Sequence, residues 1–310
     1  MVTERRQTDR TYKRRVEKTA ALLVLAALLF VGVMSMRRGD PGEEESHPPE
    51  DGVADVQTDR ELTLPEQILA MAETDSRFAP IAASMGEYPQ ELLELALKNT
   101  DAVDFVAGYP AHRNDAADSA GVDLGAISVP GAPPLLMQWD SRWGYAGYGS
   151  GIIGLAGCGP TCLSMVVLGL TGDTEANPLS VAQYSDSQGW YLPGFGSDWE
   201  LMRSGAEHYG LRWKEVMLDE GAMRRALEDG RVIIASMTEG DFTDNGHFIV
   251  LSEYENGAFR VLDPNSYVRS ARTWSFAALS PQVDGLWAYW VEEDTDAEED
   301  ADIEEGTDVE

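Results

Sequence analysis

The chain has 310 residues, 43% of them hydrophobic and 9% aromatic, and a formal net charge of −31. This composition is typical of a globular protein with its own core, and the charge argues against nucleic-acid binding, which needs clustered Lys and Arg. The charge is unevenly spread: residues 1–39 carry nine bases and three acids, residues 40–61 nine acids and one base, and residues 292–310 twelve acids and no base. The two acidic segments are expected to be solvated and disordered.

An uncharged apolar stretch runs from residue 19 to residue 36. As an α-helix it would be about 27 Å long, close to the hydrocarbon thickness of a bilayer. Bases precede this stretch and acids follow it, which predicts a transmembrane anchor with residues 1–18 in the cytoplasm and the rest of the chain outside. A cleaved signal peptide is the alternative, but the apolar run is long for one and no small-x-small cleavage site precedes Arg37.

Residues 37–61 are rich in acids, Pro and Gly without periodicity, and are interpreted as a linker. Residues 62–134 are expected to form a helical lead-in followed by a loop. Apolar periodicity predicts one helix over residues 64–71 and another over residues 89–99. Residues 110–134, rich in Ala, Asp, Gly and Pro, are predicted to be the loop.

The main domain is predicted to span residues 135–291, before the acidic tail at 292–310. Aromatic residues crowd its start, and the segment GCGPTC then opens an apolar helix. An Asn-Gly pair between two strand-like segments predicts a tight hairpin. Because helices come first and mostly adjacent strands follow, the order favours an α+β domain over a doubly wound parallel sheet. The remaining predicted elements are helices over 199–209 and 220–228 and strands over 231–237, 247–254, 258–263 and 286–291.

Cys158 is the candidate nucleophile. It stands at the start of a predicted helix, whose free N–H groups and positive dipole end stabilise a thiolate. Pro160 suits the first turn of that helix. Cys162, one turn later, is expected to be a small core residue, and a regulatory disulfide with Cys158 is the alternative. A single close pair of cysteines cannot build a disulfide framework.

Four histidines compete for the role of general base. His47 and His112 fall in predicted loops outside the main domain, and His208 falls on a predicted surface helix. His247 opens a strand directly after a glycine, so its ring stands at a strand end where close approach is possible. A structural role for His247 is the alternative, but its combination with Cys158 favours catalysis.

A base of this kind needs a third group that fixes its orientation. The predicted Asn-Gly hairpin brings the start of one strand beside the end of the next. A two-residue loop would place His247 opposite Ser266. Asp263 and Asn265 lie close to that position, and Asp263 is the better candidate because Pro264 ends the strand just beyond it. A structural Asp-Pro turn is the alternative.

Four blocks of this chain, in order, resemble the C39-like family of papain-fold cysteine peptidases: QWDSRWGYAGYG, GCGPTCLSMV, FTDNGHFIVL and FRVLDPNS. The similarity covers about residues 135–291, and the segment YPQELLELALKNTDAVDFVAGYP resembles the helical lead-in of bacterial members. The resemblance implies a papain-like fold, with N-terminal helices packed on an antiparallel sheet. It also implies Cys158 as nucleophile, His247 as base and Asp263 as the group that orients it. An oxyanion hole formed by a glutamine and the Cys158 N–H is implied too, with Gln138 as the candidate; a buried structural amide is the alternative.

The resemblance implies a thiol-dependent hydrolase that cleaves a peptide or amide bond through a thioester acyl-enzyme, and the predicted anchor places this activity outside the cytoplasmic membrane. Two alternatives stay open: a non-catalytic module of the same fold that binds peptides or cell-wall strands, and a peptidoglycan amidase or transpeptidase. The expected partners are a peptide or protein substrate and, through residues 19–36, the membrane. We expect a monomer without a cofactor, and without a metal because the histidines and cysteines lack ligand spacing.

Overall fold

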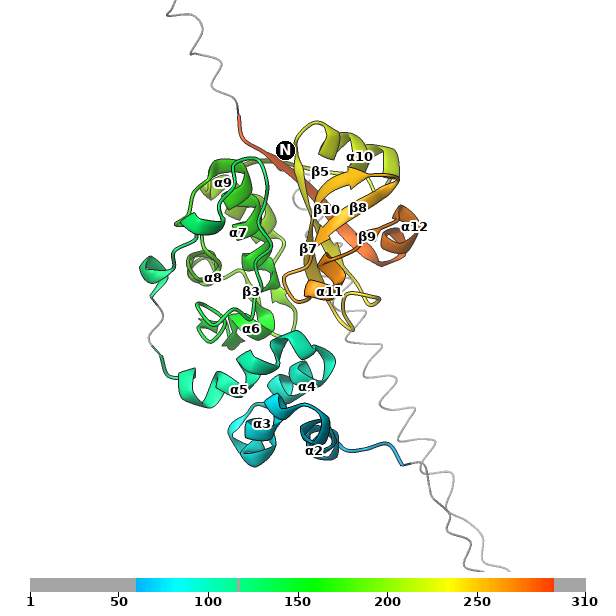
Figure 1. Cartoon of the computed structure of the whole chain (residues 1–310). Helices are drawn as coiled ribbons and strands as arrows, with labels where there is room; N and C mark the ends of the chain where they lie inside the picture. Colours follow the sequence, from blue (N-terminus) through cyan, green and yellow to red (C-terminus); the bar gives the residue numbers. More distant parts are fainter. Residues whose placement is uncertain (1–59, 116–117, 293–310) are drawn as a thin grey trace, which may run out of the picture. The chain divides into compact units, whose positions relative to one another are not determined.

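The computed structural model describes residues 60–115 and 118–292 (Figure 1). The anchor predicted at residues 19–36 lies outside the described residues, as do the predicted cytoplasmic tail, most of the linker and nearly all of the acidic tail. Within the described part of the chain, no helix is long and apolar enough to cross a membrane.

The first described segment forms short helices joined by single 3-10 turns. Helix α2 begins at a capping box, in which Thr63 and Glu66 satisfy each other's backbone N–H groups. The helices predicted over residues 64–71 and 89–99 are confirmed as α2 and α4. Helix α5 was not predicted, and it runs into the segment that was predicted to be a loop. His112 is therefore the last residue of a helix. The elements are α2 (Leu64–Thr74), η1 (Ser76–Phe78), α3 (Ala79–Ala83), η2 (Met85–Glu87), α4 (Gln90–Lys98), η3 (Thr100–Ala102), α5 (Val103–His112), η4 (Ser119–Gly121) and η5 (Gly125–Ile127).

One hydrophobic cluster joins these helices to the start of the predicted main domain. Ile68, Leu92 and Phe105 of the helices share it with Met137 and Trp139. Phe105 also stacks on Tyr145, with ring centroids 4.4 Å apart. The lead-in and the following domain therefore share apolar core on both sides of the predicted boundary at residue 135.

A helical layer follows, built around α7. This helix is buried along most of its length because apolar residues occur on all its sides, and Gly172 ends it in the left-handed conformation at φ 72°. The helix predicted over 199–209 is confirmed as one helical run over residues 200–208, which opens with a π-helical turn. The elements are β1 (Gly147–Tyr148), β2 (Gly151–Ile152), α6 (Ile153–Ala156), α7 (Cys158–Thr171), α8 (Pro178–Ser187), β3 (Tyr191–Leu192), β4 (Gly196–Ser197), η6 (Leu201–Gly205) and α9 (Ala206–His208).

The last part of the chain forms a six-stranded sheet of order β5-β10-β6-β7-β8-β9, in which every pair is antiparallel. The predicted α+β class is therefore confirmed. The elements are β5 (Arg212–Glu215), α10 (Glu220–Glu228), β6 (Val232–Met237), β7 (His247–Glu255), β8 (Ala258–Leu262), α11 (Tyr267–Ser270), β9 (Thr273–Trp274), α12 (Phe276–Leu279), η7 (Ser280–Gln282) and β10 (Val283–Trp290).

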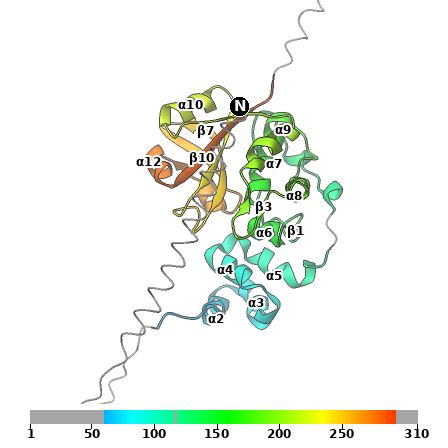
Figure 2. The same ribbon diagram turned by 180° about the vertical axis from the view of Figure 1, so that it is seen from behind.

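The sheet lies between two helical layers, as the front and back views show (Figures 1 and 2). Side chains alternate along the strands, so that Ile234 and Val250 pack toward α7 while Ile233 and Ile249 pack toward α10. Both faces of the central strands are buried. Helix α7 packs against β7, the strand that His247 opens.

The hairpin between β7 and β8 corrects one expectation. Asn256 and Gly257 form the predicted turn at φ 53° and 79°, but the register shifts by one residue between Leu251 and Glu253. A bulge at Ser252 causes the shift, and β8 ends at Leu262. The predicted pairing of His247 with Ser266 is therefore wrong. The residue paired with His247 is Met237 of β6.

Candidate active site

Cys158 is the first residue of α7, and its side chain is partly exposed. The glycines on either side of it allow the close packing that fixes the helix start. A Cβ atom on Gly157 would lie 2.5 Å from Ile153 Cγ2, and one on Gly159 would lie 2.4 Å from Ser197 Oγ. The thiol therefore stands where the first N–H groups of a fourteen-residue helix point.

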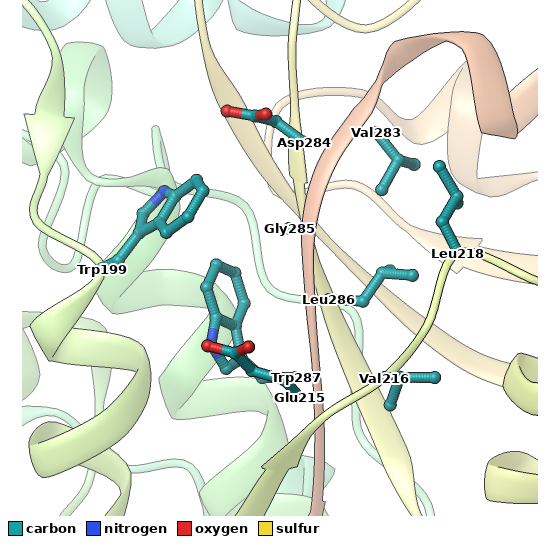
Figure 3. Close-up of a pocket in the computed structure, with 9 residues that line it drawn as sticks. All are labelled: Trp199, Glu215, Val216, Leu218, Val283, Asp284, Gly285, Leu286 and Trp287. Carbon is teal, nitrogen blue, oxygen red and sulfur yellow. The ribbon is translucent and has the colours of Figure 1, made fainter. Parts of the chain in front are cut away.

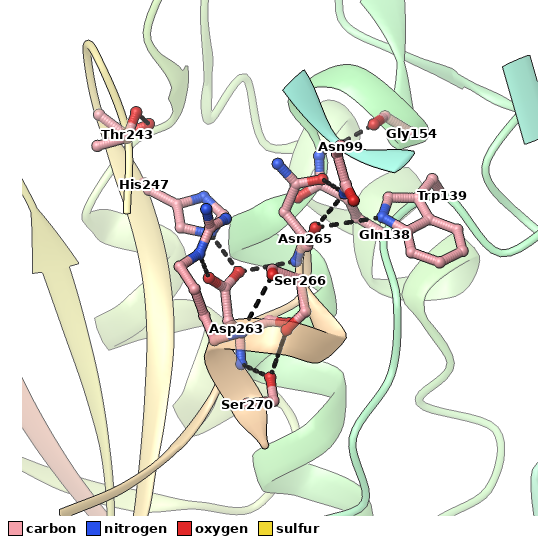
Figure 4. A network of polar contacts seen from close by, with 12 residues as sticks. Asn99, Gln138, Trp139, Gly154, Thr243, His247, Asp263, Asn265, Ser266 and Ser270 are labelled. Carbon is pink, nitrogen blue, oxygen red and sulfur yellow. Dashed lines mark hydrogen bonds and ion pairs between the residues drawn. The ribbon is translucent and has the colours of Figure 1, made fainter. Parts of the chain in front are cut away.

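His247 and Asp263 meet at the end of the sheet where β7 begins and β8 ends (Figure 4). The His247 Nε2 atom lies 2.8 Å from Asp263 Oδ1, although sixteen residues separate them in sequence. His247 is 7% exposed and Asp263 is fully buried. A buried carboxylate so close to one ring nitrogen sets the tautomer and the orientation of the imidazole.

Cys158 lies close enough to His247 to be one of the groups that raise the pKa of the imidazole. Since Nε2 is bonded to Asp263, Nδ1 is the ring nitrogen left for the sulfur. Burial disfavours the charged imidazolium, but Asp263 and Cys158 outweigh it and raise the pKa of His247 to about 10. The structure thus brings Cys158, His247 and Asp263 together in a constellation that can perform nucleophilic catalysis.

Both carboxylate oxygens of Asp263 accept hydrogen bonds. Its Oδ1 atom also accepts the Asn265 N–H at 2.8 Å, and Oδ2 accepts Arg269 Nε. The Asp263 N–H donates to Ser270 Oγ at 2.9 Å, which ties the turn to α11. Burial disfavours the charged form of Asp263, but His247 and Arg269 outweigh burial and hold its pKa below the ordinary value.

Gln138 is buried, at 3% exposure, beside this turn. Its backbone N–H donates to Pro264 O at 2.7 Å, and its Nε2 atom donates to Gly154 O at 3.0 Å. The Oε1 atom has no hydrogen-bond partner among the described residues. The carbonyl of Gly154 orients the side-chain amide, and the second N–H of Nε2 is left for another acceptor. A part in an oxyanion hole stays a prediction.

The other candidates lie apart from this constellation. Cys162 is fully buried, burial raises its pKa well above the ordinary value of a thiol, and both described cysteines are free. His208 stacks on Tyr184 with ring centroids 3.8 Å apart. His112 stacks on a tyrosine and bonds Asp115 at the surface. His47 lies outside the described residues.

Sequence reasoning missed two residues that support Asp263. Arg269 follows a serine N-cap at Ser266 and reaches back over six residues, so the segment SYVR held a local signal for a helix start. Asn99 donates to the Asn265 carbonyl from 166 residues away, and no local pattern could have indicated that contact.

A cavity of about 240 Å³ opens at the same end of the sheet (Figure 3). Val283, which lines it, pairs with Met237, which in turn pairs with His247. Two strand spacings therefore put the backbone of Val283, at one end of the cavity, roughly 10 Å from that of His247. A Cβ atom on Gly285 would lie 2.7 Å from Trp287 Cη2, so a glycine there leaves the indole its space. The lining residues are Trp199, Glu215, Val216, Leu218, Val283, Asp284, Gly285, Leu286 and Trp287.

Comparison with known proteins gives a family match. The model of the Peptidase_C39 like family matches residues 133–289, just over half of the chain. Among curated proteins, none matches. Two solved structures are similar in part. One is the peptidase domain of Streptococcus ComA, a bi-functional ABC transporter involved in a quorum-sensing pathway, with 16% identity and a TM-score of 0.34 over 44% of this chain and 93% of that one. The other is described as a C39-like peptidase from Bacillus anthracis, with 13% identity and a TM-score of 0.33 over 56% of this chain and 98% of that one.

Proposed function

Because the chain belongs to the Peptidase_C39 like family, we propose that it is a thiol-dependent peptidase with a papain-like arrangement of Cys158, His247 and Asp263. One observation carries the proposal: the His247 imidazole lies 2.8 Å from the buried Asp263 carboxylate, and the Cys158 thiol at the start of α7 is near enough to raise the pKa of the same ring. A nucleophile, a base and an orienting group are the parts that covalent catalysis by a cysteine requires.

Acylation begins when the Cys158 thiol gives its proton to Nδ1 of His247. The thiolate then attacks the carbonyl carbon of the substrate, a C–S bond forms, and the carbonyl electron pair moves to oxygen. The backbone N–H of Cys158, at the helix start, and the second N–H of Gln138 Nε2 are proposed to stabilise that oxyanion. Collapse of the intermediate breaks the C–N bond, and the leaving amine takes the proton from His247.

In deacylation, water is the nucleophile and the Cys158 sulfur is the leaving group. A water molecule gives a proton to His247 and attacks the thioester carbonyl, and the C–S bond breaks as the carbonyl re-forms. The departing Cys158 sulfur takes the proton back from His247, which restores the site. Because Asp263 is fully buried and bonded to the ring, the imidazole keeps one orientation through both half-reactions.

We propose that the cavity at the start of β10 receives a substrate side chain a few residues from the scissile bond. Trp199 and Trp287 form its aromatic wall, with ring centroids 5.1 Å apart. The Trp287 indole N–H is buried and has no hydrogen-bond partner among the described residues. Gly285 keeps the space between the strand and the indoles open.

The place of action is also proposed. The charge asymmetry around residues 19–36 supports an anchor that leaves residues 37–310 outside the cytoplasmic membrane. In that organisation a linker at 37–61 and the helical lead-in at 62–134 precede the peptidase domain at 135–291. A tag at the C-terminus should then be digested by protease added to intact cells, and a protected tag would contradict the orientation.

Selective labelling tests the proposed chemistry. Iodoacetamide should alkylate Cys158 of the full-length protein at neutral pH, and His247→Ala should abolish that selective reaction because the thiolate loses its imidazolium partner. His208→Ala is a matched control, since His208 stacks on a tyrosine away from the thiol. Unchanged labelling of Cys158 in His247→Ala would contradict the proposal.

A further inference from the structure

The end of helix α4 touches both chain segments that carry the proposed base and its orienting group. Asn99, the C-cap of α4, donates from Nδ2 to the Asn265 carbonyl at 2.5 Å. The neighbouring Lys98 forms an ion pair with Asp244 at 2.7 Å. Asn265 comes two residues after Asp263, and Asp244 comes three residues before His247. One short segment of the lead-in therefore contacts both sides of the candidate site.

A short chain of hydrogen bonds links Asn99 to the proposed base (Figure 4). Asn265, which accepts from Asn99, donates its backbone N–H to Asp263 Oδ1 at 2.8 Å. The same Oδ1 atom bonds His247 Nε2. The two Asn265 groups belong to adjacent peptide units that share its Cα atom, so a shift of the Asn265 backbone moves a donor of the carboxylate that orients the imidazole.

The Asn99 amide has a defined direction and firm support. Its Oδ1 atom accepts the Asp101 N–H at 3.1 Å, so the NH₂ group is the end that faces Asn265. Its backbone N–H donates to Leu95 O at 2.8 Å. Leu92, Leu93 and Ala96 anchor α4 in the cluster that also contains Trp139. The donor therefore belongs to a packed helix and is not a free surface group.

The two contacts at the end of α4 differ in burial and therefore in strength. The Lys98 and Asp244 side chains are 66% and 81% exposed, and ion pairs so exposed stabilise little. The Asn99 bond is partly buried and adds to the Trp139 Nε1 donor, which reaches the same carbonyl at 3.5 Å. Asn99 is therefore the contact that matters more for the turn.

We propose that Asn99 is a positioning residue of the active site, which holds the Asp263 carboxylate against His247 by fixing the backbone of Asn265. The helical lead-in is then a working part of the catalytic unit and not a spacer. Asn99 lies outside residues 133–289, the range matched by the family model. The inference rests on the proposed peptidase function.

The test compares Asn99→Ala and the isosteric Asn99→Asp with Gln90→Ala in the full-length protein. Gln90 lies on the same helix and bonds only Glu94 at the surface among the described residues, so its variant controls for changes in α4. Both Asn99 variants should lower kcat about tenfold or more while KM changes less than about twofold. The alkaline limb of the pH profile should move to lower pH, because a loosened Asp263 holds the imidazolium less well. Gln90→Ala should change none of these.

Alkylation of Cys158 by iodoacetamide at pH 7 gives a second readout that needs no substrate. It should slow in both Asn99 variants and stay at the wild-type rate in Gln90→Ala. If the wild-type protein cleaves no peptide but the Asn99 variants still slow alkylation, the peptidase function fails and the positioning role stands. Folded Asn99 variants with wild-type kcat, pH profile and alkylation rate would overturn the positioning role. Unfolding of both Asn99 variants would overturn it as well, since the contribution would then be to stability.

Discussion

The Nε2 atom of His247 lies 2.8 Å from Oδ1 of Asp263, a residue with no exposed surface. This contact decides the behaviour of the candidate site, because it leaves one ring nitrogen for Cys158 and favours the charged imidazole. Burial alone would lower the pKa of a histidine, whereas here the carboxylate outweighs it.

The pH dependence of hydrolysis should follow from this contact. His247 must be protonated to give a proton to the leaving amine, so activity should persist in alkaline solution and fall as the pH rises through about 10. Asp263→Asn removes the charge that raises the pKa of His247, and the alkaline limb should move toward the ordinary value of 6.5. Asp229→Asn, at the end of α10, should leave the limb in place. Identical profiles for wild type and Asp263→Asn would refute this cause.

Stability should depend on the second partner of Asp263. Arg269→Met leaves the buried Oδ2 atom without its charged donor and should lower the free energy of unfolding by about 3 kcal/mol at pH 7. The folded-state pKa of Asp263 is lowered, so its contribution is present above 3.8 and is lost as the pH falls through the folded-state value. Urea denaturation at pH 7 and in acid measures both effects.

Arg260→Met is the matched control for that experiment. Arg260 pairs with Glu253 on the surface, where both side chains are about half exposed, so its loss should cost under about 1 kcal/mol. Equal losses of stability in Arg269→Met and Arg260→Met would show that the buried ion pair with Asp263 stabilises the fold no more than an exposed pair does.

The two cysteines should differ sharply in reactivity. Cys162 is fully buried and burial raises its pKa, so native protein should react with iodoacetamide at Cys158 at least about a hundredfold faster. Cys162 should react only when denaturant opens the core. Peptide mapping by mass spectrometry after timed alkylation measures both rates, and comparable rates in the native protein would contradict the burial of Cys162.

The cavity beside β10 gives a prediction about substrates. Gly285→Ala places a methyl group against Trp287 and Trp199, which should raise KM severalfold for peptides with a large side chain at that subsite. Peptides with glycine there should be cleaved as before. Gly147→Ala is the control, because its added Cβ meets no atom within 4 Å. An equal change in KM for both kinds of peptide would show that the cavity does not bind a substrate side chain.

Local patterns predicted the elements whose ends carry a capping residue, a glycine or a turn-forming pair. Helix α10 has an Asp219 cap and a glycine beyond its end, and the turn at Asn256 and Gly257 takes the positive φ angles that such a pair favours. The contact between His247 and Asp263 lay within reach of the sequence because both belong to that hairpin. The bulge at Ser252 did not, since nothing in the strand pattern distinguishes the extra residue.

Long-range relations escaped prediction for a different reason. Strand β10 is the last of the described strands, yet it inserts between β5 and β6, and no local pattern indicates that order. The hydrogen bond from Asn99 to Asn265 spans 166 residues and has no periodic or capping signal. The role of Cys158 came from its place at a helix start, that of His247 from a comparison of the four histidines and that of Gln138 from the family resemblance, and all three stay predictions about chemistry.

Direct cleavage is the most decisive measurement. Full-length protein should be incubated with a diverse peptide mixture beside Cys158→Ala, and the new termini identified by mass spectrometry. The wild-type protein should generate cleaved peptides through hydrolysis of peptide bonds, and the variant, which lacks the sulfur that forms the acyl-enzyme, should generate none. Cleavage of the same bonds by wild type and Cys158→Ala, or binding of peptides without any cleavage by the wild type, would contradict the account.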